Sequence, residues 1–170
     1  MEIIKMLNPE FKKNLLRLLA ENARRPLEDI ADRLETTPEK VAAAITELEE
    51  ANEIVGYCAL IDESVLPEAA VKAIIEIKIR PEREGGFDRI ARRLSKFPQV
   101  SSLYLMSGGF DLMAEVRGAT LNDVAMFVSS KLATIDGVLS TATHFLLKKY
   151  KESGKLYEEE ESNERLQVTP

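Results

Sequence analysis

Residues 27–55 read LEDIADRLETTPEKVAAAITELEEANEIV, a stretch with two helical patterns separated by a tight turn. Apolar residues recur every three or four positions, which is the spacing of one buried helix face. They are Leu27, Ile30, Ala31 and Leu34 in the first pattern, and Val41, Ile45 and Leu48 in the second. Thr37 and Pro38 supply a capping hydroxyl and a first-turn proline. The stretch therefore predicts a helix-turn-helix whose second helix covers residues 38–50.

The flanking residues extend this unit to a small N-terminal domain. Asn8 and Pro9 begin a first helix that we expect to end near Asn22, with Phe11, Leu15, Leu18 and Leu19 at helical spacing. Residues 54–60 are mostly apolar and predict a strand, which would bury Cys58 as an inert thiol. We predict a winged-helix-like domain over residues 1–56, followed by a connecting strand and linker over residues 57–70.

Beyond residue 70 the apolar period changes from 3.6 to 2, which is typical of a half-buried strand. Val71, Ala73, Ile75, Ile77 and Ile79 alternate with more polar residues. The later elements are a helix around residues 87–94, a strand over 99–107, a hairpin turn at Gly108 and Gly109, a strand over 110–117, a helix from Thr120 to about Leu132 and a last strand from Gly137 to about Tyr150. The order βαββαβ predicts a ferredoxin-like domain over residues 71–150, and an α+β protein overall.

The first predicted strand also carries Ile74 on its more polar side, among Lys72, Glu76 and Lys78. Apolar residues on both faces of a sheet favour pairing with a second subunit, so we expect a homodimer. The alternative is that loops or the N-terminal domain cover this face within one chain. Residues 151–170 contain Glu158–Glu161 and few apolar residues, which predicts a disordered acidic tail that acts as a solubilising end or, alternatively, in function.

Composition excludes several classes of function. The net charge of −6 divides into −4 over residues 1–56, +1 over 57–150 and −3 over 151–170. A single cysteine, far in sequence from the single histidine, His144, leaves no disulfide and no metal-ligand cluster, so no metal or other cofactor is expected. His144 has no nucleophile or paired carboxylate beside it, which favours a packed or interface residue over a catalyst. The absence of a signal peptide and of a long apolar run indicates a cytoplasmic protein with no membrane partner.

Two further segments carry a family resemblance. Residues 106–112, Met-Ser-Gly-Gly-Phe-Asp-Leu, look like a Gly-x-aromatic-Asp hairpin, and residues 137–143 look like a Gly-Val-x-x-x-x-Thr entry to the last strand. Together with the helix-turn-helix and with Ile54–Tyr57, they make the chain resemble the Lrp/AsnC family of leucine-responsive, or feast/famine, transcription regulators over about residues 7–150. The resemblance implies a DNA-binding head and a body that binds an amino acid or related small metabolite and assembles into dimers and often octamers.

The resemblance, combined with the chemistry of the side chains, gives two sets of candidate residues. Hydroxyls, cations and a small residue around the second helix of the motif are the expected contacts to double-stranded DNA. These are Arg24, Arg25, Thr36, Thr37, Lys40 and Ala43. Backbone N–H groups of a glycine turn can hold a carboxylate, and an aspartate can accept from an ammonium group. The expected effector site is Ser107, Gly108, Gly109, Asp111, Thr141 and Thr143, although the turn residues could equally serve only the turn.

The chain departs from the family pattern in the second helix of the motif. Ala44 stands where an arginine is usual, Glu47 replaces a basic residue, and Glu35 occupies a turn position where glycine is common. Each lost cation removes a phosphate partner, so we expect weak binding by each head, strengthened by assembly. Restoring arginine at Ala44 is expected to strengthen binding. The sequence thus predicts a non-enzymatic DNA-binding regulator that senses an amino acid, or alternatively a metabolite-binding oligomer with a degenerate head.

Overall fold

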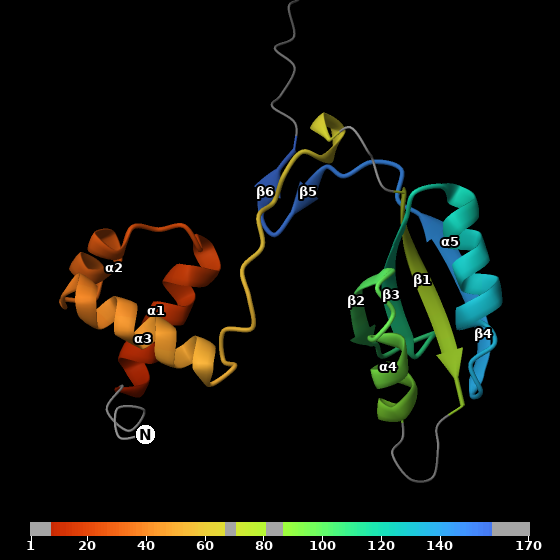
Figure 1. Ribbon diagram of the computed structural model, residues 1–170, viewed down its shortest axis with the longest axis horizontal. Coiled ribbons are helices and arrows are strands. Elements are labelled where there is room, and N and C mark those ends of the chain that lie inside the picture. The colour runs from red at the N-terminus through yellow and green to blue at the C-terminus, as the bar shows by residue number, and fades with distance from the viewer. Residues whose placement is uncertain (1–7, 67–70, 81–86, 158–170) are drawn as a thin grey trace, which may run out of the picture. The chain divides into compact units, whose positions relative to one another are not determined.

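The computed structural model describes residues 8–66, 71–80 and 87–157 (Figure 1). The chain divides between Leu60 and Ile61 into two compact units, within the predicted connector 57–70. We call the described residues up to 60 the head and those from 61 to 157 the body. Glu158–Glu161, on which the predicted acidic tail depends, lie outside the described residues.

The head contains three helices, α1 (Pro9–Glu21), α2 (Leu27–Arg33) and α3 (Pro38–Glu50). The predicted caps form: Asn8 Oδ1 accepts from the Glu10 N–H at 3.0 Å, and Thr37 Oγ1 accepts from the Lys40 N–H at 3.5 Å. One apolar cluster joins the three helices, made of Leu15, Leu19, Ile30, Ala31, Val41, Ala44 and Leu48. The helix-turn-helix prediction is therefore confirmed.

Glu35 lies in the turn between α2 and α3, in a backbone conformation that usually favours glycine. Its backbone has a φ of 50°, in the left-handed region that glycine adopts without steric cost. The next residue, Thr36, donates its N–H to the Ala31 carbonyl at 3.0 Å and closes the end of α2. A glutamate at this position therefore strains the turn, and the surrounding helix contacts must compensate for that strain.

The predicted strand over residues 54–60 is wrong. Residues 51–66 contain no strand, and the Val55 side chain is 91% exposed. A strand needs a neighbouring edge for its N–H and C=O groups, and the described residues offer this segment none. Cys58 is consequently exposed, so the expectation of a buried thiol is also wrong.

The body is a four-stranded antiparallel sheet with helices on one face (Figure 1). Its strands are β1 (Val71–Ile79), β2 (Val100–Leu105), β3 (Leu112–Gly118) and β4 (Val138–Phe145), and its helices are α4 (Asp88–Leu94) and α5 (Leu121–Phe127), the latter continued by the π-helical turn η2 (Val128–Leu132). The strand order β2-β3-β1-β4 is that of a split βαβ sheet. The predicted ferredoxin-like fold is confirmed.

Alternation along β1 assigns the two faces of the sheet. Ile75 and Ile77 are fully buried against the helices, in a cluster that includes Ile90 of α4 and Val124 of α5. The intervening residues, including Ile74, lie on the opposite face, which α4 and α5 leave uncovered (Figure 1). The predicted core of the sheet is therefore correct, and neither α4 nor α5 covers the opposite face.

The C-terminal part of the body differs from the prediction. β4 ends at Phe145 instead of near Tyr150, and residues 151–157 form a small hairpin of β5 (Lys151–Glu152) and β6 (Lys155–Leu156). The predicted disordered tail is therefore wrong for its first seven described residues. A turn at Ser153 and Gly154, both with positive φ, lets the strands pair, and charged side chains hold the hairpin in place.

Gly137, at the entry to β4, is required by its backbone and by its surroundings. Its φ is 92°, and an added Cβ would lie 2.6 Å from Ile90 Cδ1 of α4. Gly137→Ala is expected to lower the free energy of unfolding by about 1–3 kcal/mol, measured by denaturant titration. Gly108→Ala is the control, because Gly108 also has positive φ but faces open space. An equal loss in both variants would show that the Ile90 contact contributes nothing.

Candidate functional site

The exposed surface of α3 is small and acidic. Lys40, Ala43 and Thr46 are exposed, together with Glu39, Glu49 and Glu50. Ala44 is only 3% exposed and belongs to the core of the head. The interpretation of Ala44 as a lost phosphate contact is therefore wrong, because helical periodicity turns that position inward between Val41 and Leu48. Ala43, one residue earlier, faces outward as expected.

The N-terminus of α3 already holds an anion. The Glu39 carboxylate accepts hydrogen bonds from its own N–H and from Thr37, and these bonds hold the pKa of Glu39 below its ordinary value of 4.5. Thr37 also caps the helix, and Thr36 is half-buried. Glu39 is thus ionised at neutral pH beside the first turn, where an approaching phosphate would meet its charge.

The two candidate arginines have different environments. Arg25 donates from Nη1 to Asp29 Oδ2 at 2.7 Å, lies 3.5 Å from Glu21 and has a side chain only 15% exposed. These bonds, with those from Arg33, lower the pKa of Asp29. Arg25 thus connects α1 to α2. Arg24 is exposed and makes no ion pair among the described residues, so its guanidinium is free to meet a phosphate.

The structure adds cations that sequence patterns alone did not single out. Lys13 and Arg17 lie one helical turn apart on the exposed side of α1 and have no ion-pair partner within residues 8–66. Their i, i+4 spacing, out of phase with the buried Leu15 and Leu19, was the available signal. Glu47, in contrast, is half-buried, and its Oε2 has no hydrogen-bond partner among the described residues.

The predicted effector residues begin at the β2–β3 hairpin. Ser107, Gly108 and Gly109 are exposed, and Gly108 has a φ of 133°. Below them the Met106 N–H donates to the Asp111 carbonyl at 2.8 Å and closes the loop. Within the described part of the chain, the N–H groups of these three residues make no hydrogen bond. They are therefore available to an anionic ligand.

Asp111 has a structural task that leaves part of its carboxylate unused. Its Oδ2 accepts from the Ile79 N–H at 2.8 Å, and its own N–H donates to the Ile77 carbonyl at 3.0 Å. These bonds bridge β3 to the end of β1, where the β1–β4 register shifts between Lys78 and Ile79. Among the described residues Oδ1 has no partner, so Asp111 can stabilise the turn and still accept from a ligand.

Thr141 and Thr143 lie across β1 from this hairpin. They pair with the buried Ile77 and Ile75, so their side chains share the helix-covered face of the sheet. Thr141 reaches the same end of the sheet as Asp111, about two strand spacings or roughly 10 Å away. Thr143 is two residues further along β4, on the same face of the sheet. The structure therefore groups the hairpin with Asp111 and brings Thr141 to the same end, while Thr143 is more distant.

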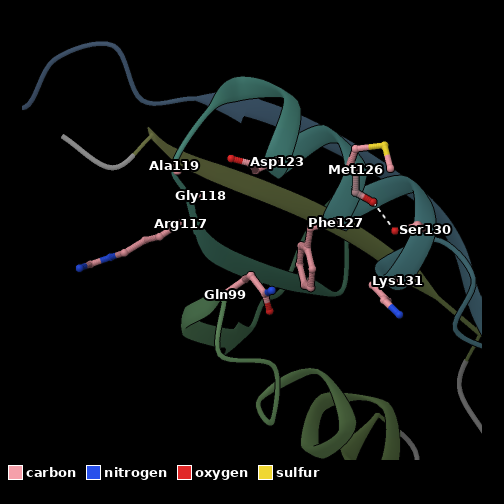
Figure 2. A pocket seen from close by; sticks show the side chains of 9 residues that line it. All are labelled: Gln99, Arg117, Gly118, Ala119, Asp123, Met126, Phe127, Ser130 and Lys131. Carbon is pink, nitrogen blue, oxygen red and sulfur yellow. Dashed lines mark hydrogen bonds between the residues drawn. The ribbon is translucent and has the colours of Figure 1, made fainter. Parts of the chain in front are cut away.

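A shallow pocket lies elsewhere in the body, between the end of β3 and α5, and none of the predicted effector residues lines it. Its lining is Gln99, Arg117, Gly118, Ala119, Asp123, Met126, Phe127, Ser130 and Lys131 (Figure 2). Two of its polar side chains, Asp123 and Ser130, already make hydrogen bonds within or next to α5. Asp123 forms the capping box with Thr120, and Ser130 donates to the Met126 carbonyl at 2.5 Å. Arg117 points away from Phe127 and Lys131 (Figure 2), so the polar groups do not converge on one point.

A catalytic histidine, a metal site and a membrane span have little support from the described residues. His144 is exposed, and its Nε2 lies 3.4 Å from Glu76 on the uncovered face of the sheet. No group of three metal-binding side chains occurs among the described residues, and no helix in the described ranges is long and apolar enough to cross a membrane.

Comparison with known proteins assigns the chain. The description "Lrp/AsnC ligand binding domain" matches residues 72–156, and "Winged helix-turn-helix DNA-binding" matches residues 9–54. The chain belongs to the Lrp/AsnC family. Lrp/AsnC proteins with this pair of domains are DNA-binding transcriptional regulators and not enzymes, which confirms the resemblance found in the sequence.

Two relatives and one solved structure support the assignment. The uncharacterized HTH-type transcriptional regulator YugG of Bacillus subtilis (strain 168) is 43% identical over 162 residues, 95% of this Lrp/AsnC chain and 98% of YugG. The HTH-type transcriptional regulator LrpA of Pyrococcus horikoshii is 32% identical, over 84% of this chain and 98% of LrpA. The fold also matches a transcriptional regulator from Neisseria meningitidis in complex with L-Met, with a TM-score of 0.64 and 23% identity, over 85% and 93% of the two chains.

Proposed function

We propose that this Lrp/AsnC regulator is a cytoplasmic homodimer that binds DNA weakly through each head and responds to an amino acid held at the β2–β3 hairpin. The observation that carries the proposal is that the N–H groups of Ser107–Gly109 and Oδ1 of Asp111 lie at the same turn and have no hydrogen-bond partner among the described residues. Donors and an acceptor at one turn match the two charged ends of a zwitterion.

Two arguments support an amino acid as the effector: the chemistry of these groups, and the ligand of a solved structure with a similar fold. The hairpin N–H groups would hold the carboxylate, Asp111 would accept from the ammonium, and Thr141 would contribute a hydroxyl. Thr143 would act further along β4. The regulator from Neisseria meningitidis, which shares the fold, was solved with L-Met, and L-methionine is therefore the first probe to use.

The DNA surface that we propose consists of Arg24, Thr36, Thr37, Lys40 and Ala43, with Lys13 and Arg17 as additional cations. Arg25 supports this surface from within the head. The acidic residues on α3 limit the affinity of one head, so two or more linked heads are needed for useful binding.

The uncovered face of the sheet is the surface that we propose for dimerisation. Tyr104 pairs with Met113, and Ile74 lies on the same face. Tyr104 is 50% exposed, Ile74 and Met113 are partly buried, and no helix among the described residues covers these three side chains. Covering them with a second copy is the common solution for such sheets. Octamers would require further contacts between dimers.

The double variant Arg24→Gln, Lys40→Gln tests the DNA surface. We expect weaker binding to DNA from upstream of the gene, and a logarithmic salt slope shallower by about two, because each lost phosphate contact removes about 0.9. Fluorescence anisotropy of labelled DNA measures both. Lys96→Gln, at an exposed lysine after α4 in the body, is the matched control. If the control and the double variant show the same slope, the proposed surface does not bind phosphate.

A further inference from the structure

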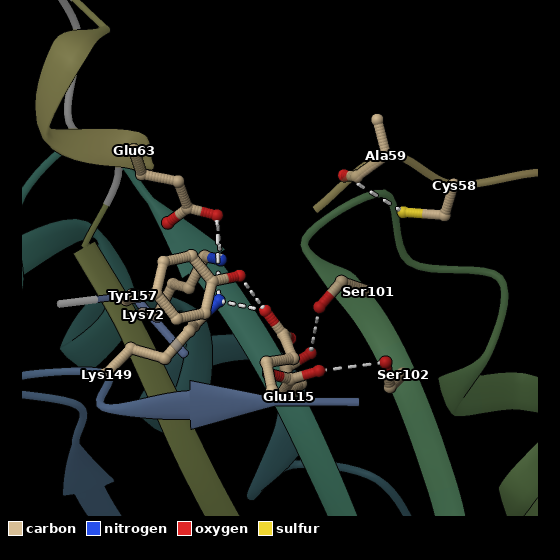
Figure 3. A network of polar contacts seen from close by, with 10 residues as sticks. Cys58, Ala59, Glu63, Lys72, Ser101, Ser102, Glu115, Lys149 and Tyr157 are labelled. Atoms are coloured by element: carbon tan, nitrogen blue, oxygen red, sulfur yellow. Dashed lines mark hydrogen bonds and ion pairs between the residues drawn. The ribbon is translucent and has the colours of Figure 1, made fainter. Parts of the chain in front are cut away.

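A chain of charged side chains connects four separate segments of the body. Lys72 of β1 donates to Glu63 of η1 (Glu63–Val65), and Lys149 lies 3.9 Å from the same carboxylate. Lys149 also donates to Glu152 Oε2 at 2.6 Å, and the Tyr157 hydroxyl donates to that oxygen at 2.5 Å. Figure 3 shows Glu63, Lys72, Lys149 and Tyr157 converging. The network thus connects η1, which follows the head in the chain, with the C-terminal hairpin of β5 and β6.

Apolar burial does not hold these pieces in place. Val65 of η1 is 75% exposed, and Leu156 of β6 is 73% exposed. A single 3₁₀ turn and a hairpin of two-residue strands are both marginal without tertiary support. Lys72, in contrast, is 7% exposed, so its ammonium depends on Glu63 to offset its desolvation. Charge is therefore the main interaction that fastens both segments to the sheet.

We propose that this charged network forms an ionic strap that fixes the point at which the chain leaves the body toward the head, and that opening the strap lengthens the tether. Tyr57 donates to Glu49 Oε1 at 2.8 Å, which fixes the other end of the tether to α3. With the strap closed, residues 58–62 remain between the two fixed points, and five residues reach at most about 17 Å. With the strap open, the residues of η1 are also released, and the reach grows by about 3.3 Å for each residue that is freed.

This change in reach matters for a protein with linked heads. Half-sites one turn of DNA apart are separated by about 34 Å. Two heads on longer tethers can reach a wider range of half-site spacings than two heads on short tethers. A closed strap would restrict the half-site spacings that two heads can span, and an open strap would relax this restriction. This consequence depends on the proposed DNA-binding function, whereas the strap itself does not.

Hydrogen exchange on the full chain without DNA tests the strap. In Lys149→Met we expect the amides of Val65 and Leu66 to exchange several-fold faster than in the wild type, because Glu63 loses one of its two ion-pair partners and the hairpin loses its connection to η1. Lys155→Met is the matched control: Lys155 lies in the same hairpin, is exposed and makes no ion pair among the described residues. Unchanged exchange at Val65 and Leu66 in Lys149→Met would overturn the proposal.

Tyr157→Phe is a second test of the strap, for the case in which Lys149→Met disturbs the sheet. This variant removes one hydroxyl from Glu152 and leaves both lysines, so we expect faster exchange at Leu66 with unchanged protection of β1 and β3. Raising sodium chloride from about 0.05 to 0.5 M should accelerate exchange in the wild type and less in Lys149→Met, because salt screens the partly exposed pair of Lys149 with Glu152 more than it screens the buried Lys72. Equal salt responses in the two proteins would also contradict the strap.

Acid provides an independent way to open the strap. Lys72 is the main cause that lowers the pKa of Glu63, with Lys149 and Arg117 adding to it, and Lys149 and Tyr157 lower the pKa of Glu152, with a smaller contribution from Lys72. A lowered carboxyl pKa contributes stability above the ordinary value of 4.5, and this stability is lost as pH falls through the folded pKa. Exchange at Leu66, corrected for its intrinsic pH dependence, should therefore accelerate below pH 4.5. If it does not, these carboxylates do not hold η1.

Discussion

Replacing Ala44 with arginine is expected to unfold the head while the body stays folded. Ala44 is 3% exposed among Val41, Leu48 and the apolar residues of α1 and α2. A larger side chain there costs about 1–3 kcal/mol through overpacking, and a buried guanidinium without a partner costs several kcal/mol more. A helical domain of this size has little stability in reserve. Helix-specific hydrogen exchange and circular dichroism measure the loss.

Ala43→Arg is the matched control, because the same side chain is added one residue earlier on the exposed side of α3. We expect the head to remain folded, DNA binding to strengthen several-fold at low salt, and the logarithmic salt slope to steepen by about 0.9. The reverse result, a folded Ala44→Arg head with stronger DNA binding, would show that α3 is rotated relative to the structure.

Asp111→Asn is expected to weaken amino-acid binding at least about tenfold and to leave the body folded. The asparagine carbonyl can still accept from the Ile79 N–H, as Asp111 Oδ2 does at 2.8 Å. The variant loses the negative charge of the Asp111 carboxylate, which we propose to accept from the ammonium group of the ligand. Charge-assisted hydrogen bonds are about twice as strong as neutral ones. Calorimetric titration with L-methionine, followed by the other amino acids, measures the change.

Asp111→Ala separates the two roles of this residue. It removes the acceptor as well as the charge, so the body should lose about 1–3 kcal/mol of stability in addition to ligand affinity. Thermal unfolding compares Asp111→Asn with Asp111→Ala. If Asp111→Asn binds amino acids as tightly as the wild type, Asp111 serves only the turn and the effector site lies elsewhere in the body.

The fold could be predicted largely from periodicity and punctuation. Helical spacing and the caps at Asn8 and Thr37 placed α1 and α3, and the alternation around Ile75 and Ile77 placed β1. These signals are local, since a cap or an alternating stripe acts within a few residues. Residues 54–60 have the same apolar character but no neighbouring edge, and sequence alone does not state which strands have partners.

The sites were harder to predict because they depend on contacts between distant residues. Ala44 was assigned by resemblance to a DNA-facing position, whereas the phase of α3 turns it into the core. The bond from Ile79 to Asp111 spans 32 positions, and the network from Lys72 to Tyr157 spans most of the body. No local pattern encodes such pairs, although Lys72 within an otherwise apolar strand was a detectable irregularity.

Binding of the protein to labelled DNA from upstream of its gene tests whether it is a DNA-binding regulator that responds to an amino acid. Anisotropy would be measured at about 50 and 200 mM salt, with random DNA as competitor, with and without L-methionine and a mixture of the other amino acids. We expect binding that weakens with salt, prefers the upstream DNA and changes when an amino acid is present. No binding at about 50 mM salt in either condition would contradict it, and would leave a metabolite-binding oligomer with a silent head.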